Sequence, residues 1–128
     1  MKLFNTLKTL ITEAADKSEV CQAVNGRNVT SIYYSGDMTL NPGYRTIEPV
    51  AAGLTKLKGN VPGNPVLRAW QTAGATDRPN KTPGWKFFRL DRISNWEPLV
   101  DTFDEVRPNF NPNGDKSMHG QPWCIAKF

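Results

Sequence analysis

Short segments rich in β-branched and aromatic residues, separated by clusters of turn-forming residues, constrain the fold of this chain most strongly. They run from Val29 to Ile93, with Asn41-Pro42-Gly43 and a Gly/Asn/Pro run over 59–65 between them. β-branched and aromatic side chains favour strands, whereas Gly, Pro and Asn favour turns. Strands are therefore predicted over residues 29–34, 44–50, 51–57, 66–71 and 85–93, the last with a bulge or an end near Asp91.

Helices are expected only before the first strand. Apolar residues between Leu3 and Ala14 recur at i, i+3, i+4 and i+7, which predicts an amphipathic helix over 2–15. A second helix is predicted to begin at Ser18, whose hydroxyl can cap the first turn, and to end at Asn25-Gly26. These residues are too few for a three-helix DNA-reading unit.

The pattern weakens after Ile93. Residues 96–106 are compatible with a short helix or an extended edge, and 122–128 with a final strand. A chain of 128 residues has room for one hydrophobic core. We therefore predict a single mainly β domain over 1–128, a small antiparallel barrel of about five strands with N-terminal helices. Its parts are a helical lead-in (1–26), a barrel core (28–93) and a C-terminal extension (94–128).

The lack of a recognisable targeting signal and the small number of cysteines suggest a cytoplasmic protein. Apolar runs are shorter than a membrane helix needs, and polar residues interrupt the N-terminus too soon for a signal peptide. Cys21 and Cys124 are the only cysteines, which excludes a disulfide framework. In a reducing compartment two buried thiols are expected in preference to a bridge.

Charge is concentrated in the middle of the chain. The net charge is +4, but residues 43–93 contain nine Lys and Arg against three Asp and Glu, whereas 1–42 is balanced and 94–128 is acidic. Such a segment indicates a surface or pocket that meets anions. Lys and Arg dispersed over solvated strand faces would give the same count, so the charge alone leaves both interpretations open.

Four segments resemble one family in order and approximate spacing. The lead-in strand 29–34 precedes Tyr44-Arg45-Thr46-Ile47-Glu48-Pro49, then Val66-Leu67-Arg68-Ala69-Trp70, and finally Phe88-Arg89-Leu90-Asp91-Arg92-Ile93. This series resembles the WYL domain family, and the last hexapeptide is its most specific element. At the name-giving tripeptide the chain reads Pro65-Val66-Leu67 and keeps only the leucine.

The resemblance implies a function as well as a fold. WYL domains are Sm-like, SH3-like β-barrels that bind nucleic acid or nucleotide-type effectors, usually joined to a helix-turn-helix domain in bacterial transcription regulators and often dimeric. A copy without that domain is expected to be an accessory or virus-like regulator. We expect it to bind short single-stranded nucleic acid or a nucleotide, with no cofactor and no catalysis.

Arginines interleaved with aromatic residues are the candidate ligand-binding groups. Arg45, Arg89 and Arg92 match basic positions of the family motifs, and a guanidinium donates two parallel hydrogen bonds to phosphate. Arg68 shares the alternation set of Trp70, and aromatic side chains can stack on bases. The predicted site residues are Tyr34, Tyr44, Arg45, Arg68, Trp70, Arg89 and Arg92.

Structural roles compete with this interpretation. Arg92 can instead pair with Asp91 or Glu48 and brace the barrel, and strand aromatics more often pack in a core than bind ligands. Trp85, Phe87 and Phe88 are assigned to barrel closure.

Two other functions were weighed. A protein-interaction or dimerisation module would use the stripe of helix 2–15 or a barrel edge, with a second copy or a host transcription or defence regulator as partner. A nuclease-like enzyme would use His119, but the chain offers it no recognisable dyad. One His and two distant Cys lack metal-ligand spacing, so no metal is expected.

Overall fold

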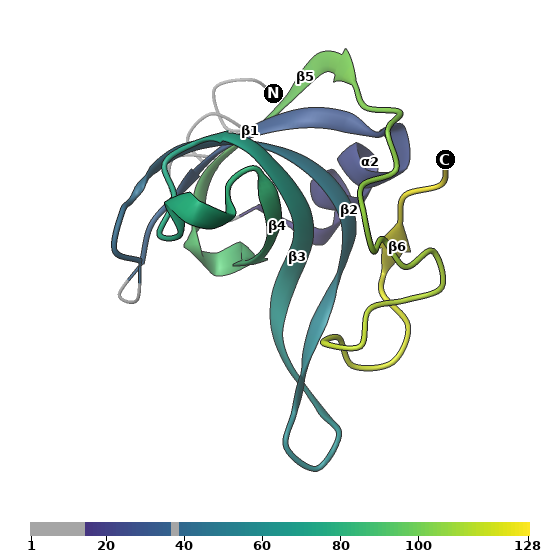
Figure 1. The fold of residues 1–128 in the computed structure, drawn as a ribbon. Coiled ribbons are helices and arrows are strands. Elements are labelled where there is room, and N and C mark those ends of the chain that lie inside the picture. Colours follow the sequence, from purple (N-terminus) through teal and green to yellow (C-terminus); the bar gives the residue numbers. More distant parts are fainter. Residues whose placement is uncertain (1–14, 37–38) are drawn as a thin grey trace, which may run out of the picture.

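Strands dominate the computed structural model, which describes residues 15–36 and 39–128 (Figure 1). Six strands form one antiparallel sheet in the order β4-β3-β2-β1-β5, and β6 pairs with β2 off this path. In chain order the elements are α2 (Lys17–Gly26), β1 (Asn28–Tyr34), β2 (Gly43–Leu57), β3 (Val61–Gly74), the 3-10 helix η1 (Pro79–Lys81), β4 (Gly84–Arg89), the 3-10 helix η2 (Leu90–Arg92), β5 (Ile93–Thr102) and β6 (Cys124–Ile125).

Helix α2 begins two residues earlier than a Ser18 cap would allow. Asp16 is the N-cap: its carboxylate accepts from the Glu19 amide at 2.9 Å, and the Glu19 side chain accepts from the Asp16 amide at 3.3 Å. This reciprocal capping box satisfies two free amides at once, which a lone serine hydroxyl cannot do. The prediction of Ser18 as cap is therefore wrong, whereas the helix end at Gly26 is confirmed. The helix predicted over 2–15 lies, except for Ala15, outside the described residues.

The two strands predicted over 44–50 and 51–57 are one long strand. β2 is 15 residues long, and its pairing with β3 shifts register between Pro49 and Ala51. Proline has no amide to donate, so a bulge there keeps the strand continuous through a position that a regular ladder excludes. The β2–β3 hairpin stays paired out to Leu57 and Val61 and projects away from the rest of the molecule (Figure 1).

The strand predicted over 85–93 ends at Arg89, where η2 turns the chain into β5. β5 pairs with β1, so the stretch 96–106 starts as an extended edge and not as a helix. β4 and β5 are the two ends of the hydrogen-bonded path, so the sheet is not closed and the expected barrel is not confirmed. The predicted mainly β, antiparallel architecture is confirmed.

The core lies between the sheet and α2. Ile32, Ile47, Leu67 and Phe88 are almost fully buried, and Val20 of α2 packs with them. Strand β6 confirms the final strand predicted within 122–128. Both β5 and β6 fall in the stretch predicted as a C-terminal extension, so the sheet continues beyond residue 93. Within the described part of the chain, no helix combines the length and apolarity needed to cross a membrane.

The two cysteines form a disulfide, so the prediction of two buried thiols is wrong. Cys21 of α2 and Cys124 of β6 are joined, with their Cα atoms 5.7 Å apart. Both elements pack against β2, which brings residues 103 positions apart into bonding distance. The thiol prediction depended on an assumed reducing compartment, which residue patterns do not encode.

Candidate anion-binding cavity

A cavity of about 450 Å³ lies along β4, one of the two free edges of the sheet. We call it the basic cavity. It is lined by Tyr34, Thr39, Arg45, Arg68, Thr76, Asp77, Arg78, Lys81, Trp85, Lys86, Phe87, Phe88 and Arg92.

Strand alternation places the walls of the basic cavity. Successive side chains of β4 point to opposite faces, so Trp85 and Phe87 lie on one face and Lys86 and Phe88 on the other. All four line the cavity, which therefore follows the exposed edge of the strand. Gly74 ends β3 with a φ of +102°, a conformation open to glycine, and lets the chain leave the sheet into the loop that carries Thr76, Asp77, Arg78 and Lys81 of the lining.

Six Lys and Arg side chains line the basic cavity against a single acid, Asp77. That carboxylate is already engaged: it accepts from the amides of Asn41 at 2.7 Å and Leu40 at 3.2 Å and lies 3.6 Å from Arg45. Burial would raise the pKa of Asp77, but the two amides and the Arg45 charge outweigh it and hold the pKa below its usual value. Asp77 is thus a fixed anion that offsets one cation.

Arg45 is the most buried cation of the basic cavity, at 4% exposure. Its Nη2 donates to the Asn41 carbonyl at 2.9 Å, and its guanidinium lies 5.1 Å from the Tyr34 ring centroid and 5.8 Å from that of Phe88. Within residues 15–36 and 39–128, no acceptor lies in hydrogen-bonding range of its buried Nε. Burial lowers the pKa of Arg45, against the opposing attraction of Asp77. A buried N–H without an acceptor is costly, so Arg45 contributes its charge to the cavity at the expense of folding stability.

Lys86 is held among other cations. Its ammonium donates to the Lys81 carbonyl at 3.2 Å and to Thr76 Oγ1 at 3.3 Å. Burial, followed by the charges of Arg45 and Arg78, lowers its pKa from the ordinary value. These positive charges repel one another, and a bound anion would relieve the repulsion.

The structure gathers four of the seven predicted site residues around the basic cavity: Tyr34, Arg45, Arg68 and Arg92. Tyr34 is 7% exposed, its ring packs edge-on against Phe88, and its hydroxyl accepts from the Arg89 amide at 3.0 Å. It is therefore a wall of the cavity and a support for Arg45, with little face left for stacking.

The other three predicted site residues lie elsewhere. Tyr44 precedes Arg45 on β2, so its side chain points to the opposite face of the strand. It is 59% exposed and packs on Tyr33. Arg89 forms a two-pronged pair with Asp91, at 3.0 and 2.6 Å. Trp70 packs edge-on against Trp85 and beneath the Arg107 guanidinium.

The brace predicted as an alternative role for Arg92 uses carboxylates that have other partners. Asp91 binds Arg89, and Glu48 accepts two hydrogen bonds of 2.9 Å from Arg107. Glu48 and Asp91 thus form their ion pairs with arginines other than Arg92.

Several cavity residues were not singled out from the sequence. Arg78, Lys81 and Lys86 entered the charge count of 43–93, but the loop carrying the first two was treated only as exposed connection. Trp85, Phe87 and Phe88, assigned to barrel closure, all line the cavity. The charge excess was the signal that pointed to this segment.

The residues considered for catalysis lie in the C-terminal segment and α2. Both cysteines are joined in the disulfide, and the backbone amide of His119 donates to the Leu54 carbonyl at 2.8 Å. In the described ranges, no three His, Cys, Asp or Glu residues gather in a way that would hold a metal ion.

Comparison of the chain with protein-family models, with curated proteins and with solved structures finds no match. The geometry of the basic cavity is therefore the main ground for a functional proposal.

Proposed function

We propose that this protein is a regulatory binding module that holds the phosphate groups of a short single-stranded nucleic acid or a nucleotide in the basic cavity, without catalysis. The observation that carries the proposal is the convergence of six cations on one cavity, where Asp77 and Asp115 pair with Arg45 and Arg68 and leave an excess of positive charge on the other four. Arginine donors in fixed geometry suit phosphate oxygens, and the lining aromatics suit bases.

The WYL resemblance supports the same proposal from the sequence side. Its name-giving strand lies within β3, and its closing hexapeptide spans the end of β4, η2 and the start of β5. The strand order, with η2 linking the two edge strands, is compatible with a strongly bent, Sm-like small barrel, which we retain as part of the proposal.

A binding assay with matched variants tests the proposal. Arg78 and Lys81 are exposed, so Arg78→Ala/Lys81→Ala removes two cavity charges without emptying the core. We expect fluorescence anisotropy with short single-stranded DNA and RNA to show salt-sensitive binding that the variant weakens roughly tenfold. Its log-log salt slope should fall by about 1.4, because each phosphate contact contributes about 0.7 on single strands.

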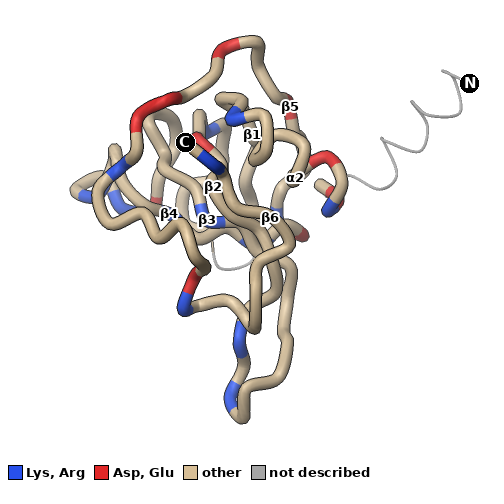
Figure 2. The backbone as a smooth tube through the Cα atoms, turned by 90° about the vertical axis from the view of Figure 1, so that its right-hand side faces the viewer, with Lys and Arg blue, Asp and Glu red and all other residues tan. Residues whose placement is uncertain are grey.

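The matched control is Lys56→Ala/Lys58→Ala at the hairpin tip. These lysines are equally exposed and remove the same charge, but they lie far from the basic cavity, where Figure 2 shows Lys and Arg on the projecting hairpin. Equal losses in both double variants would reduce the effect to overall charge. Absence of binding to oligonucleotides, nucleotides and inorganic phosphate at low salt would refute the proposal.

The sheet edge opposite β4 favours a second candidate function, protein interaction. Among the described residues, β5 pairs only with β1, and Val100 on it is 97% exposed. A free strand edge can pair with a second copy or with a host regulator. Light scattering across a concentration series tests the homodimer, and replacing the edge residue in Val100→Lys should abolish any dimer that forms there.

The predicted cytoplasmic location is a proposal that the disulfide weighs against, because disulfides persist mainly in oxidising compartments. Alkylation of the protein from its native source, denatured without reductant, distinguishes the two. Labelled Cys21 and Cys124 would support the cytoplasm, and unlabelled cysteines an oxidising compartment.

A further inference from the structure

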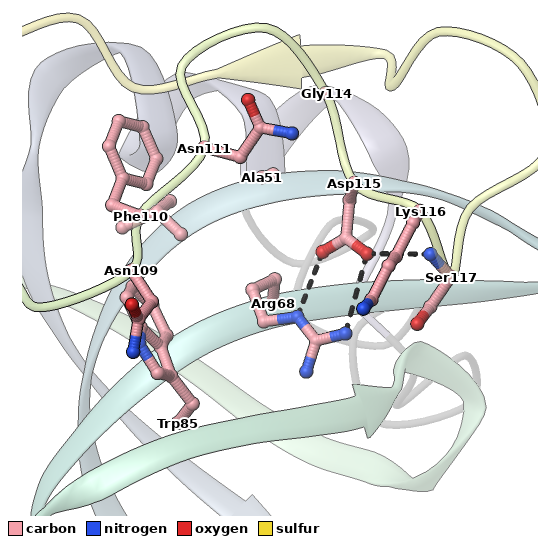
Figure 3. Close-up of a pocket in the computed structure, with 11 residues that line it drawn as sticks. Ala51, Arg68, Trp85, Asn109, Phe110, Asn111, Gly114, Asp115, Lys116 and Ser117 are labelled. Atoms are coloured by element: carbon pink, nitrogen blue, oxygen red, sulfur yellow. Dashed lines mark hydrogen bonds and ion pairs between the residues drawn. The ribbon is translucent and has the colours of Figure 1, made fainter.

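A second pocket lies beside the basic cavity, under the C-terminal segment (residues 103–128). Its volume is about 270 Å³, and Val50 and Ala51 of β2 contribute to its lining. Figure 3 shows Asn109, Phe110 and Trp85 along one side and Arg68 with Asp115 along the other. We call it the apolar pocket. Its size suits one ring system and falls just short of the pockets that hold drug-sized ligands.

The walls of the apolar pocket are fixed before any ligand arrives. The Trp85 indole N–H donates to the Pro108 carbonyl at 2.6 Å, and its ring packs edge-on against Trp70. The Phe110 ring packs edge-on against Phe128, with centroids 5.3 Å apart. Aromatic walls held in place bind a planar ring at little cost in conformational entropy.

The two pockets differ in charge. On the side of the apolar pocket, Arg68 is neutralised by Asp115 through hydrogen bonds of 2.8 and 3.4 Å, whereas the basic cavity keeps a large excess of cations. Arg68 and Trp85 line both, so the two pockets are neighbours across these side chains. Such a pair fits a ligand with an anionic group joined to a neutral planar ring.

We propose that the apolar pocket receives a nucleobase of the ligand whose phosphate occupies the basic cavity, so this inference rests on the proposed function. Phe110 and Trp85 offer apolar surface to the ring, and the Asn109 amide offers both a donor and an acceptor to its edge. The pocket thus makes affinity depend on the presence of a base.

Paired ligands and paired variants test the base subsite. Binding of a short oligothymidylate is compared with that of an oligonucleotide of equal length and charge made of abasic residues. Asn109 has a φ of +67°, so Asn109→Gly removes the amide without straining the backbone. Asn60 at the hairpin tip has a φ of +58°, which makes Asn60→Gly a control of identical chemistry. Phe110→Ala removes an aromatic wall.

We expect the wild type to bind the oligothymidylate at least about fivefold more tightly than the abasic strand, as base stacking on aromatics predicts. Phe110→Ala and Asn109→Gly should reduce that ratio and leave abasic binding unchanged, whereas Asn60→Gly should leave both unchanged. Equal affinity for the two strands would overturn the base subsite and leave the proposed function intact. Binding of neither strand would overturn the base subsite, and a further absence of binding to nucleotides and inorganic phosphate would overturn the proposed function as well.

Discussion

Two arginines of this chain each pair with an aspartate but differ in burial. Arg45 is 4% exposed and packs on two aromatic rings, whereas the Arg89 side chain is 36% exposed beside Asp91. Exposed ion pairs contribute little to stability, because water already solvates both charges. A buried cation placed over aromatic rings is lost at greater cost.

Replacing each arginine by methionine separates these cases. We expect Arg45→Met to lower the free energy of unfolding by about 2 kcal/mol, since it breaks cation–π contacts and leaves Asp77 without its partner. Arg89→Met should leave the free energy of unfolding almost unchanged. Urea denaturation of both variants measures the difference, and equal losses would contradict the role given to burial.

Lys86 makes phosphate binding depend on pH. Its pKa in the free protein is lowered from the ordinary 10.5, and only its cationic form attracts an anion. Above about pH 8, where inorganic phosphate is a dianion, its affinity should therefore fall as the pH rises through the lowered pKa, before 10.5 is reached. In Lys86→Arg the fall should move to higher pH, because arginine stays charged. Isothermal titration across pH 7 to 11 checks this, with Lys56→Arg expected to behave as the wild type.

At the residue level, the sequence predicted the positive charge of the cavity better than it predicted which residues line the cavity. Arg45 was selected because it matches a basic motif position, and Arg68 because it shares the alternation set of Trp70. Arg89 lies outside the basic cavity and pairs with Asp91 two residues away, a pairing that motif matching ignores. Arg78 and Lys81 were missed because a loop has no periodicity from which its fold back onto β4 could be predicted.

The C-terminal segment is the element held by the most varied contacts. Its backbone amides at Trp123 and Ala126 donate to β2, Arg107 pairs with Glu48, and Cys124 is bonded to α2. None of these contacts follows from local pattern, since each joins residues far apart in the chain. Strands and turns, which are local, were largely predicted, whereas this segment was not assigned a position.

Breaking the disulfide should loosen this segment. A cross-link over 103 residues restricts the unfolded chain strongly, so Cys21→Ser/Cys124→Ser should lower the free energy of unfolding by about 3 to 5 kcal/mol. Thermal melts with and without reductant measure the loss. The reductant should have no effect on the double variant, and a wild type that is equally insensitive would show that the bond is dispensable.

At the scale of the whole molecule, six cations meet in the single basic cavity beside β4. A long groove binds longer strands more tightly, whereas a single cavity of about 450 Å³ does not. We therefore expect affinity for single-stranded oligonucleotides to stop rising by about four nucleotides. Anisotropy over a length series tests this, and a continued rise per added nucleotide, beyond the statistical gain in sites, would indicate a surface outside the cavity.

The bond between Cys21 and Cys124 closes most of the polypeptide into a covalent ring. The tip of the projecting hairpin, with Gly59 and Asn60 exposed, lies on that ring. A protease that cuts there opens the ring but releases no fragment, because the disulfide still joins the two pieces. The nicked protein therefore migrates as one band on a denaturing gel until it is reduced. New termini can accordingly be placed at this tip, with α2 and β6 still joined by the disulfide.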